Sequence, residues 1–347
     1  MRIEKVHSFD DVLLVPKYSI IHSRKDINLK TSISGVELGI PIISANMSSV
    51  TDVEMCLTLG QLGGLGILHR MMDIKTMISS LKEIPEDIKV GFSFGVGEDW
   101  YYRLEAGIEY GGNIACLDVA HAHHIKVKEI LKKIASSKVF YNFPIIVGNI
   151  ATESAATDIM CWYTENHILE PEKALQKLTL KVGIGGGSLC TTRIMTGCGI
   201  PTLQSILDIA PSVSCDIIAD GGIKNSGDIV KCLAAGSNAV MLGSLLSGTK
   251  ESPGDIILGR DGNKYKVYRG SASFGDKKVR GETTKNIEGV ETLVEYKGSV
   301  VDIINNLTDG IRSGYSYLGG DLTDCEFVEI SGSGFKESTP HGVNYAF

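Results

Sequence analysis

Short runs of apolar residues, many of them β-branched, recur along the chain and usually end in glycine or a polar residue. Their unbroken apolar character predicts strands that are buried on both faces, as in a parallel sheet. The eight runs are residues 39–45, 64–69, 90–96, 114–119, 144–149, 181–185, 216–220 and 239–243. Helix-like stretches lie between most of these runs, for example residues 50–62, 73–83, 126–136 and 226–235. Eight consecutive strand–helix units predict an α/β fold, a (β/α)8 TIM barrel, with an open doubly wound sheet as the alternative.

Three segments fall outside this repeat. Residues 158–177 read as an extra helical insertion that is broken at Glu170-Pro171. Residues 271–288 are rich in glycine and charge and show no periodicity, which predicts a mobile flap. Residues 320–347 form a C-terminal segment after the last unit. We expect no second domain, so residues 1–347 are interpreted as a single catalytic barrel domain.

Composition and charge narrow the class of protein. Hydrophobic residues make up 43% and charged residues 22% of the chain, which is the profile of a globular protein. No run of about 18 apolar residues is present, so no membrane span is expected. The net charge of −7 argues against nonspecific nucleic-acid binding. The polar first residues carry no export signal, so the eight cysteines predict reduced thiols in a cytoplasmic protein.

The stretch 185–193, GGGSLCTTR, is the strongest local signal for chemistry. It follows a predicted strand, and barrel active sites form on the loops after the strands. Three consecutive glycines allow backbone amides to turn toward an anion. Cys190, close to an expected helix N-terminus, would have its thiolate form favoured. The pattern indicates a nucleophilic cysteine beside a bound phosphate; the alternative is that Cys190 is one more small buried hydrophobic residue.

Two further strand ends point to a phosphorylated nucleoside. Residues 220–222 (DGG) and 242–244 (LGS) follow the seventh and eighth runs. Glycine amides at these positions can bind a phosphate, and the Asp220 carboxylate suits ribose hydroxyls. The alternative is a tight turn with a helix-capping carboxylate. Asp118, at the end of the fourth run, either takes part in the chemistry or anchors a loop.

The histidines of the sequence HAHH, residues 121–124, suggest a metal site only weakly. Their spacing does not place two ligands on one helix face, and no pair of carboxylates accompanies them. We therefore interpret His121, His123 and His124 as solvated or hydrogen-bonded side chains.

Several motifs together resemble one enzyme family. They are SFDDVLLVP (8–16), GNIAT (148–152), VGIGGGSLCTTR (182–193), TGCGIPTLQSI (196–206), ADGGI (219–223), VMLGSLL (240–246) and YRGSAS (268–273). In this order they resemble the IMP dehydrogenase/GMP reductase family, and the likeness runs from about Ser8 to His341. It implies a (β/α)8 barrel that is usually a homotetramer. It also implies chemistry at C2 of a purine nucleotide monophosphate, through a covalent cysteine adduct and a nicotinamide cofactor.

The resemblance assigns roles to matching residues. Cys190 would be the nucleophile, and Thr192 and Glu288 would handle the group that leaves or enters at C2. The substrate-binding positions, with Asp220 on the ribose, are Met47, Asn149, Gly187, Ser188, Asp220, Gly222, Gly243, Ser244, Tyr268 and Gly270. Asp118, Ser271 and Ala272 match cofactor-binding positions. Backbone carbonyls of Gly185, Gly187 and Cys190, with residues 337–338, are the candidates for a K⁺ site.

The flap decides which branch of the family we favour. Dehydrogenases carry an Arg-Tyr pair there that activates water, whereas the only arginine of this flap, Arg280, precedes a glycine. The chain also lacks room for the inserted regulatory domains of most dehydrogenases, and Asn46-Met47 resembles the reductases. These features favour an NADPH-dependent GMP reductase. Residues 62–70, 312–319 and 327–338 resemble the dehydrogenases, so an IMP dehydrogenase that uses NAD is the first alternative.

A third alternative is a nucleotide-binding relative without activity. It is suggested by departures from the usual family residues, namely Ser48-Ser49, Ala122, Gly186 and Ser271. The same departures leave room for a modified purine as the base. They do not touch Cys190 or Thr192.

Overall fold

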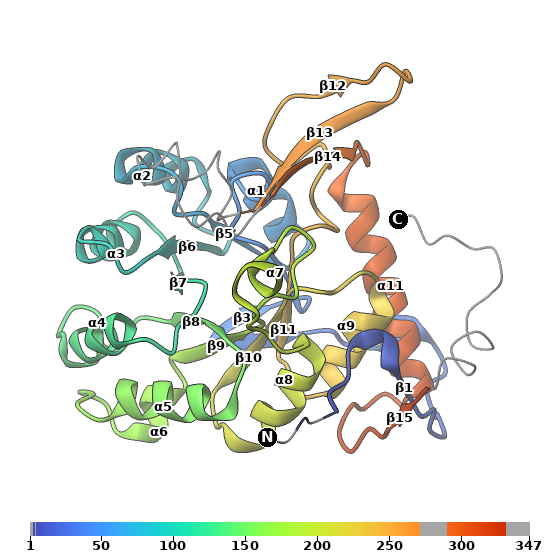
Figure 1. Cartoon of the computed structure of the whole chain (residues 1–347), viewed down its shortest axis with the longest axis horizontal. Coiled ribbons are helices and arrows are strands. Elements are labelled where there is room, and N and C mark those ends of the chain that lie inside the picture. Colours follow the sequence, from blue (N-terminus) through green and yellow to red (C-terminus); the bar gives the residue numbers. More distant parts are fainter. Residues whose placement is uncertain (1–2, 4, 271–289, 331–347) are drawn as a thin grey trace.

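The computed structural model describes residues 3, 5–270 and 290–330. Eight parallel strands close into a barrel in the order β10-β11-β4-β5-β6-β7-β8-β9 (Figure 1). Their bounds are β4 Ile42–Ser44, β5 Leu65–Leu68, β6 Val90–Phe94, β7 Ile114–Asp118, β8 Ile145–Ile150, β9 Leu178–Val182, β10 Asp216–Asp220 and β11 Ala239–Leu242. The predicted (β/α)8 TIM barrel is confirmed, and the open doubly wound sheet is excluded because β11 pairs with β4.

One predicted strand is displaced. The run 181–185 was expected to form the sixth barrel strand, but β9 begins at Leu178 and ends at Val182. The chain cannot continue as a strand because Gly183 and Gly185 take φ values of 146° and 83°, which side chains rarely adopt. Lys181 is therefore an interior residue of β9 rather than its first residue.

A helix follows each barrel strand, and together these helices surround the barrel (Figure 1). They are α1 Val53–Gln61, α2 Ile74–Glu83, α3 Trp100–Glu109, α4 Ile125–Ser136, α5 Glu153–Thr164, α8 Thr202–Ile209, α9 Ser226–Ala234 and α11 Val300–Tyr317. Several begin at a polar cap of the preferred type, such as Asp73, whose carboxylate accepts from the amide of Thr76. The apolar strand runs and the helix-like stretches between them therefore account for the inner layer of strands and the outer layer of helices. The polar caps mark the residues at which several of the helices start.

The predicted insertion is only partly an addition to the barrel. Its first half belongs to α5, which begins at Glu153 and is the helix that follows β8. The extra element is the short helix α6, Pro171–Leu175, which starts with proline in its first turn. The predicted break at Glu170-Pro171 is therefore where α6 begins.

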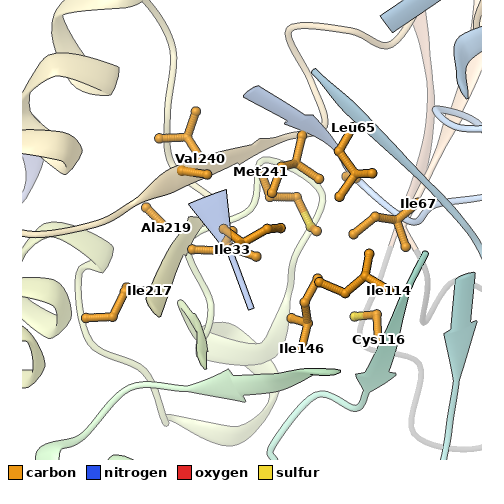
Figure 2. Close-up of a cluster of buried hydrophobic side chains, with 14 of the residues drawn as sticks. Ile33, Leu65, Ile67, Ile114, Cys116, Ile146, Ile217, Ala219, Val240 and Met241 are labelled. Atoms are coloured by element: carbon orange, nitrogen blue, oxygen red, sulfur yellow. The ribbon is translucent and has the colours of Figure 1, made fainter. Parts of the chain in front are cut away.

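A small hairpin closes the amino-terminal end of the barrel. It consists of β2 (Thr31–Ile33) and β3 (Val36–Leu38), with left-handed φ at Ser34 and Gly35 in the turn. The amide of Ser34 donates to Asp216 Oδ2 at 2.7 Å, which ties the turn to the start of β10. Figure 2 shows the side chain of Ile33 among apolar side chains of the barrel strands. The hairpin thus supplies part of the barrel core.

We expect Ile33→Ala to lower the free energy of unfolding by about 2–5 kcal/mol, because the fully buried side chain cannot be replaced without leaving a cavity. Urea-induced unfolding followed by circular dichroism measures the change. Leu258→Ala, at a site that is 71% exposed, is the control and should change stability by less than about 0.5 kcal/mol. Equal losses in the two variants would contradict the assignment of Ile33 to the core.

Two smaller sheets lie outside the barrel. A three-stranded antiparallel sheet, at the top of Figure 1, consists of β12 (Ile257–Leu258), β13 (Lys264–Arg269) and β14 (Glu291–Glu295). β1 (Val12–Leu14) pairs with β15 (Phe327–Glu329), which joins the beginning of the chain to its end. The remaining short elements are α7 Thr192–Thr196 and the 3₁₀ helices Phe9–Asp11, Arg24–Asp26 and Ala210–Ser212. Within the described ranges, no helix has both the length and the apolar character needed to span a membrane.

Candidate active site

Cys190 lies in the glycine-rich loop between β9 and α7. The Cys190 amide donates to the carbonyl of Gly187 at 3.0 Å, which forms a tight turn before the helix. Its half-buried Sγ lies 3.1 Å from Thr192 Oγ1. At Gly183 an added Cβ would lie 1.8 Å from the carbonyl oxygen of Asp220. Glycine is required there because the loop packs directly on the end of β10.

The chain on either side of residues 271–289 lies beside this loop. The Gly270 amide donates to the Val290 carbonyl at 3.0 Å, and the Val290 amide donates to the Leu189 carbonyl at 3.3 Å. Gly270 is thus placed next to the cysteine loop. Glu288, Ser271 and Ala272, together with the rest of the predicted flap, lie outside the described residues.

The candidate phosphate-binding residues come together from three loops and from β13. An added Cβ on Gly243 would lie 3.0 Å from Tyr268 Oη and 3.4 Å from Met47 Sδ. The Tyr268 hydroxyl also bonds the Ser188 side chain; burial raises the pKa of Tyr268, and this hydrogen bond acts against the rise. The absence of a side chain at residue 243 therefore lets Met47 and Tyr268 approach the backbone closely, and Tyr268 links this position to the cysteine loop through Ser188. Ser244 follows directly and begins a turn.

The loop after β10 packs against the same cysteine loop. Gly221 and Gly222 have φ values of 91° and 82°, and an added Cβ on Gly221 would lie 2.9 Å from the amide nitrogen of Gly187. An added Cβ on Gly222 would lie 3.5 Å from the carbonyl oxygen of Gly186. Gly187 and Gly222 are thus brought together at the carboxyl ends of β9 and β10, as the sequence predicted.

A polar cluster lies at the carboxyl ends of β7 to β10. In it, three predicted site residues, Asp118, Asn149 and Asp220, are joined by Lys181, which was not predicted. Lys181 Nζ bonds Asp118 Oδ1 at 3.0 Å and Asp220 Oδ2 at 3.1 Å, and it also bonds Asn149 Oδ1. Asn149 Nδ2 donates to Asp220 Oδ2 at 2.8 Å. Lys181 is only 2% exposed. These side chains lie at the same height along the barrel, because Asp118 pairs in register with Gly148 on β8 and Gly148 pairs in register with Lys181 on β9.

The charges of this cluster stabilise each other. Burial alone would raise the pKa of the Asp118 carboxyl, but Lys181 and Arg70 outweigh it and lower that pKa below its usual range. Burial opposes the charged form of Lys181 as well, yet Asp118 and Asp220 raise the pKa of its ammonium group. Arg70 Nε lies 3.7 Å from Asp118 Oδ2. Two cations and two carboxylates therefore share the barrel mouth.

The sequence contains a sign that Lys181 is functional, but the wrong bounds predicted for this strand concealed it. With β9 at Leu178–Val182, Lys181 and Thr179 are two residues apart and share a face of the strand. A lysine between Leu180 and Val182 in a strand that is buried throughout requires a buried partner. The expected strand at 181–185 instead placed Lys181 at the solvent-accessible start.

A cavity of about 740 Å³ adjoins the cluster at the ends of β5, β6 and β7. Its lining includes Arg70, Asp99, Arg103 and Val119. Arg70 Nε is buried and bonds no acceptor in the part of the chain that the structure describes. Arg70 therefore lies between the cavity and Asp118, and its Nε forms an ion pair with Asp118 Oδ2 at 3.7 Å.

The three neighbouring histidines make local contacts. His124 caps α4 by accepting from the amide of Lys126 at 3.2 Å. His123 Nε2 lies 2.8 Å from Asp158 Oδ2, and its ring stacks on Trp162. Among the described residues, no group of three or more histidine, cysteine or acidic side chains could hold a metal ion.

Comparison with known proteins gives the family. Residues 6–341 match the IMP dehydrogenase / GMP reductase domain. The inosine-5'-monophosphate dehydrogenase of Cryptosporidium parvum is 34% identical over 404 aligned residues, covering 98% of this chain and 96% of that protein. The corresponding protein of Borreliella burgdorferi is 32% identical over 409 aligned residues, covering 97% and 96%.

A solved structure extends the likeness to three dimensions. A cysteine-to-alanine variant of GMP reductase from Trypanosoma brucei, in complex with guanosine 5'-monophosphate, superposes with a TM-score of 0.89. It is 25% identical, and the match covers 98% of each chain. The chain therefore belongs to the IMP dehydrogenase/GMP reductase family of oxidoreductases, which act in purine metabolism with a nicotinamide cofactor.

Proposed function

We propose that this protein is a GMP reductase, which uses NADPH to convert GMP to IMP and ammonia. The observation that carries the choice of reaction is in the sequence of the segment between Gly270 and Val290, whose ends flank the cysteine loop. Its one arginine, Arg280, is followed by glycine, so it lacks the Arg-Tyr pair with which dehydrogenases of the family activate water. The reductase needs no water at C2. The likeness to a GMP reductase over 98% of both chains supports the same choice.

The nucleotide would bind across the ends of the barrel strands. Its phosphate would lie among Ser188, Gly222, Gly243, Ser244 and Tyr268, where glycine amides and two hydroxyls supply donors. The ribose would bond Asp220, and the base would lie over Met47, with Asn149, Gly187 and Gly270 completing its surroundings. The contact of Gly243 with both Tyr268 and Met47 supports this placement, because it puts the phosphate and base positions side by side.

Cys190 would carry the covalent step. Its Sγ attacks C2 of the guanine, and the bond from C2 to the exocyclic nitrogen breaks as that nitrogen is protonated and leaves as ammonia. Thr192, whose Oγ1 lies 3.1 Å from Sγ, and Glu288 would move the proton to the leaving amine. A hydride then bonds to C2 as the C–S bond breaks, which releases IMP and restores the thiolate.

The charged residues at the barrel mouth fit a nicotinamide cofactor. When bound, NADPH supplies the hydride. Asp118 at the barrel mouth would bind the nicotinamide end of the cofactor. Lys181 holds the Asp118 carboxylate in place. The 740 Å³ cavity beyond it, which is lined in part by Arg70, has room for more of the same molecule. Ser271 and Ala272 would complete the cofactor site. A K⁺ ion on the carbonyls of Gly185, Gly187 and Cys190, and assembly as a homotetramer, complete the proposal.

The second candidate function is that of an IMP dehydrogenase, which oxidises IMP to XMP with NAD⁺. One observation favours it: the curated relatives above, at 32–34% identity, both carry that name. Their alignments run over 404 and 409 positions, more than the 347 residues of this chain, so each relative has residues that this chain lacks.

Nicotinamide absorbance distinguishes the two candidates directly. One sample contains GMP and NADPH, and a parallel sample contains IMP and NAD⁺ with potassium. We expect loss of NADPH in the first sample and no change in the second. Formation of NADH in the second sample alone would make the protein a dehydrogenase and Arg280 the residue to test for water activation. No change in either sample would favour a modified purine or a relative that only binds nucleotide.

A further inference from the structure

The turn after β11 has the polarity of a short helix. The amides of Leu246 and Ser247 donate to the Gly243 carbonyl at 3.1 and 2.9 Å. The amides of Ser244 and Leu245, at the start of the turn, bond no other residue that the structure describes. Such unsatisfied amides carry a partial positive charge and point toward the start of the turn, and the carbonyls point the opposite way. The amide end is the part that the proposed function gives to the phosphate.

Lys297 occupies the carbonyl end of the same turn. Its Nζ donates to the carbonyl oxygens of Ser244 at 2.5 Å and Leu245 at 3.3 Å. The Lys297 backbone is fixed as well, because its amide donates to the Gly248 carbonyl at 2.9 Å. In the described part of the chain, no carboxylate forms an ion pair with this ammonium group. The charge of Lys297 is therefore directed at two carbonyls of the turn.

We propose that Lys297 is a positioning residue for the phosphate of the nucleotide, acting through the turn that begins at Ser244. The inference rests on the proposed placement of the phosphate. A cation at the carbonyl end neutralises the negative end of the turn and holds the peptide planes so that the amides at its start face the phosphate. It also adds positive potential where the net charge of −7 otherwise disfavours an anion.

The charge of Lys297 is sensitive to pH near neutrality. Burial lowers the pKa of its ammonium group to about 8. The other titratable groups around it are Lys224, Glu295, Tyr296 and Asp302, which line an adjoining cavity of about 610 Å³. Because the pKa is lowered, the ammonium form is present below pH 8 and is lost as the pH rises through that value. The phosphate is a dianion throughout this range, so its binding should weaken as the pH rises.

The contribution of the phosphate to binding affinity is the ratio of the Kd of guanosine to the Kd of GMP. Titration calorimetry at pH 7.5 and pH 9.5 measures both constants. Ionisation of the guanine base affects both ligands and cancels in the ratio. For the wild-type protein we expect the ratio to fall about tenfold between the two pH values. Lys297→Met should give the wild-type ratio of pH 9.5 at both pH values. Lys297→Arg keeps its charge and should give the wild-type ratio of pH 7.5 at both pH values.

Lys266→Met is the matched control. Lys266 is buried, whereas Lys297 is half-buried, and as with Lys297 its Nζ donates to backbone carbonyls, those of Lys250 and Ser252, neither of which belongs to the turn. Its ratio should follow that of the wild-type protein. A wild-type ratio that does not change with pH, or a Lys297→Met ratio equal to that of the wild type at pH 7.5, overturns the role of Lys297. Wild-type protein that binds neither ligand overturns the proposed function itself.

Discussion

Replacing Cys190 with alanine should lower the turnover of GMP at least about a thousandfold and leave the Kd of GMP nearly unchanged. The proposed function gives the bond to C2 to this thiol, so its loss should remove the covalent route altogether. The contacts proposed for the phosphate and the ribose, at Gly243, Tyr268 and Asp220, lie outside the cysteine loop and remain. Steady-state rates of NADPH oxidation and a calorimetric Kd for GMP measure the two effects separately.

The matched control is Cys198→Ala. Cys198 is exposed and lies in the same connection between β9 and α8, and its thiol donates to the carbonyl of Thr196 at 3.7 Å. Its loss should change turnover by less than about twofold, as for most surface substitutions. Acid-quenched wild-type enzyme mixed with GMP should also show an adduct on the peptide that contains Cys190, detected by mass spectrometry. Turnover that persists in Cys190→Ala would remove this cysteine from the mechanism.

The barrel could be predicted because each strand carries its own evidence. The run that became β10 coincides with the observed strand, and 114–119 and 239–243 differ from β7 and β11 by one residue. Buried parallel strands are apolar on both faces, so the pattern is continuous and local. The sheet of β12, β13 and β14 could not be predicted in the same way. Its strands carry exposed residues such as Leu258 and Leu293, and its pairing joins segments from either side of residues 271–289.

The candidate site was predictable where glycine and cysteine mark it. The loops at 185–193 and 220–222 contain residues whose backbone conformations need glycine, and the structure packs these loops together. Lys181 was not predicted because its importance depends on strands far apart in the sequence. Asp118, Asn149 and Asp220 reach it only when β7, β8, β9 and β10 lie side by side. Long-range contacts of this kind leave little local trace.

Lys181→Met is expected to have the second large effect, on both stability and catalysis. The substitution leaves the largely buried carboxylates of Asp118 and Asp220, 15% and 21% exposed, without the cation between them, which should lower the free energy of unfolding by about 3–5 kcal/mol. We also expect kcat/KM to fall about a hundredfold, because the side chains proposed to orient the ribose and the nicotinamide both lose their anchor. Urea-induced unfolding and NADPH oxidation measure the two effects. Lys132→Met, which breaks the surface ion pair with Glu165, is the control and should cost at most about 1 kcal/mol.

The pH dependence of stability and activity in Lys181→Met distinguishes a role for the charge of Lys181 from a role for its shape. In the wild-type protein the pKa of Asp118 is lowered, so the stability that this carboxylate contributes is present at neutral pH and is lost only as the pH falls through the lowered value. Without Lys181 only Arg70 is left to oppose the effect of burial, so the pKa of Asp118 should rise and the acid limb of activity should move to higher pH. The stability deficit should shrink on acidification, as the carboxyls become neutral in both proteins. Adding Asp118→Asn should restore part of the stability, because one uncompensated carboxylate is removed. A deficit that is the same at every pH, and is not relieved by Asp118→Asn, would mean that Lys181 contributes packing rather than charge.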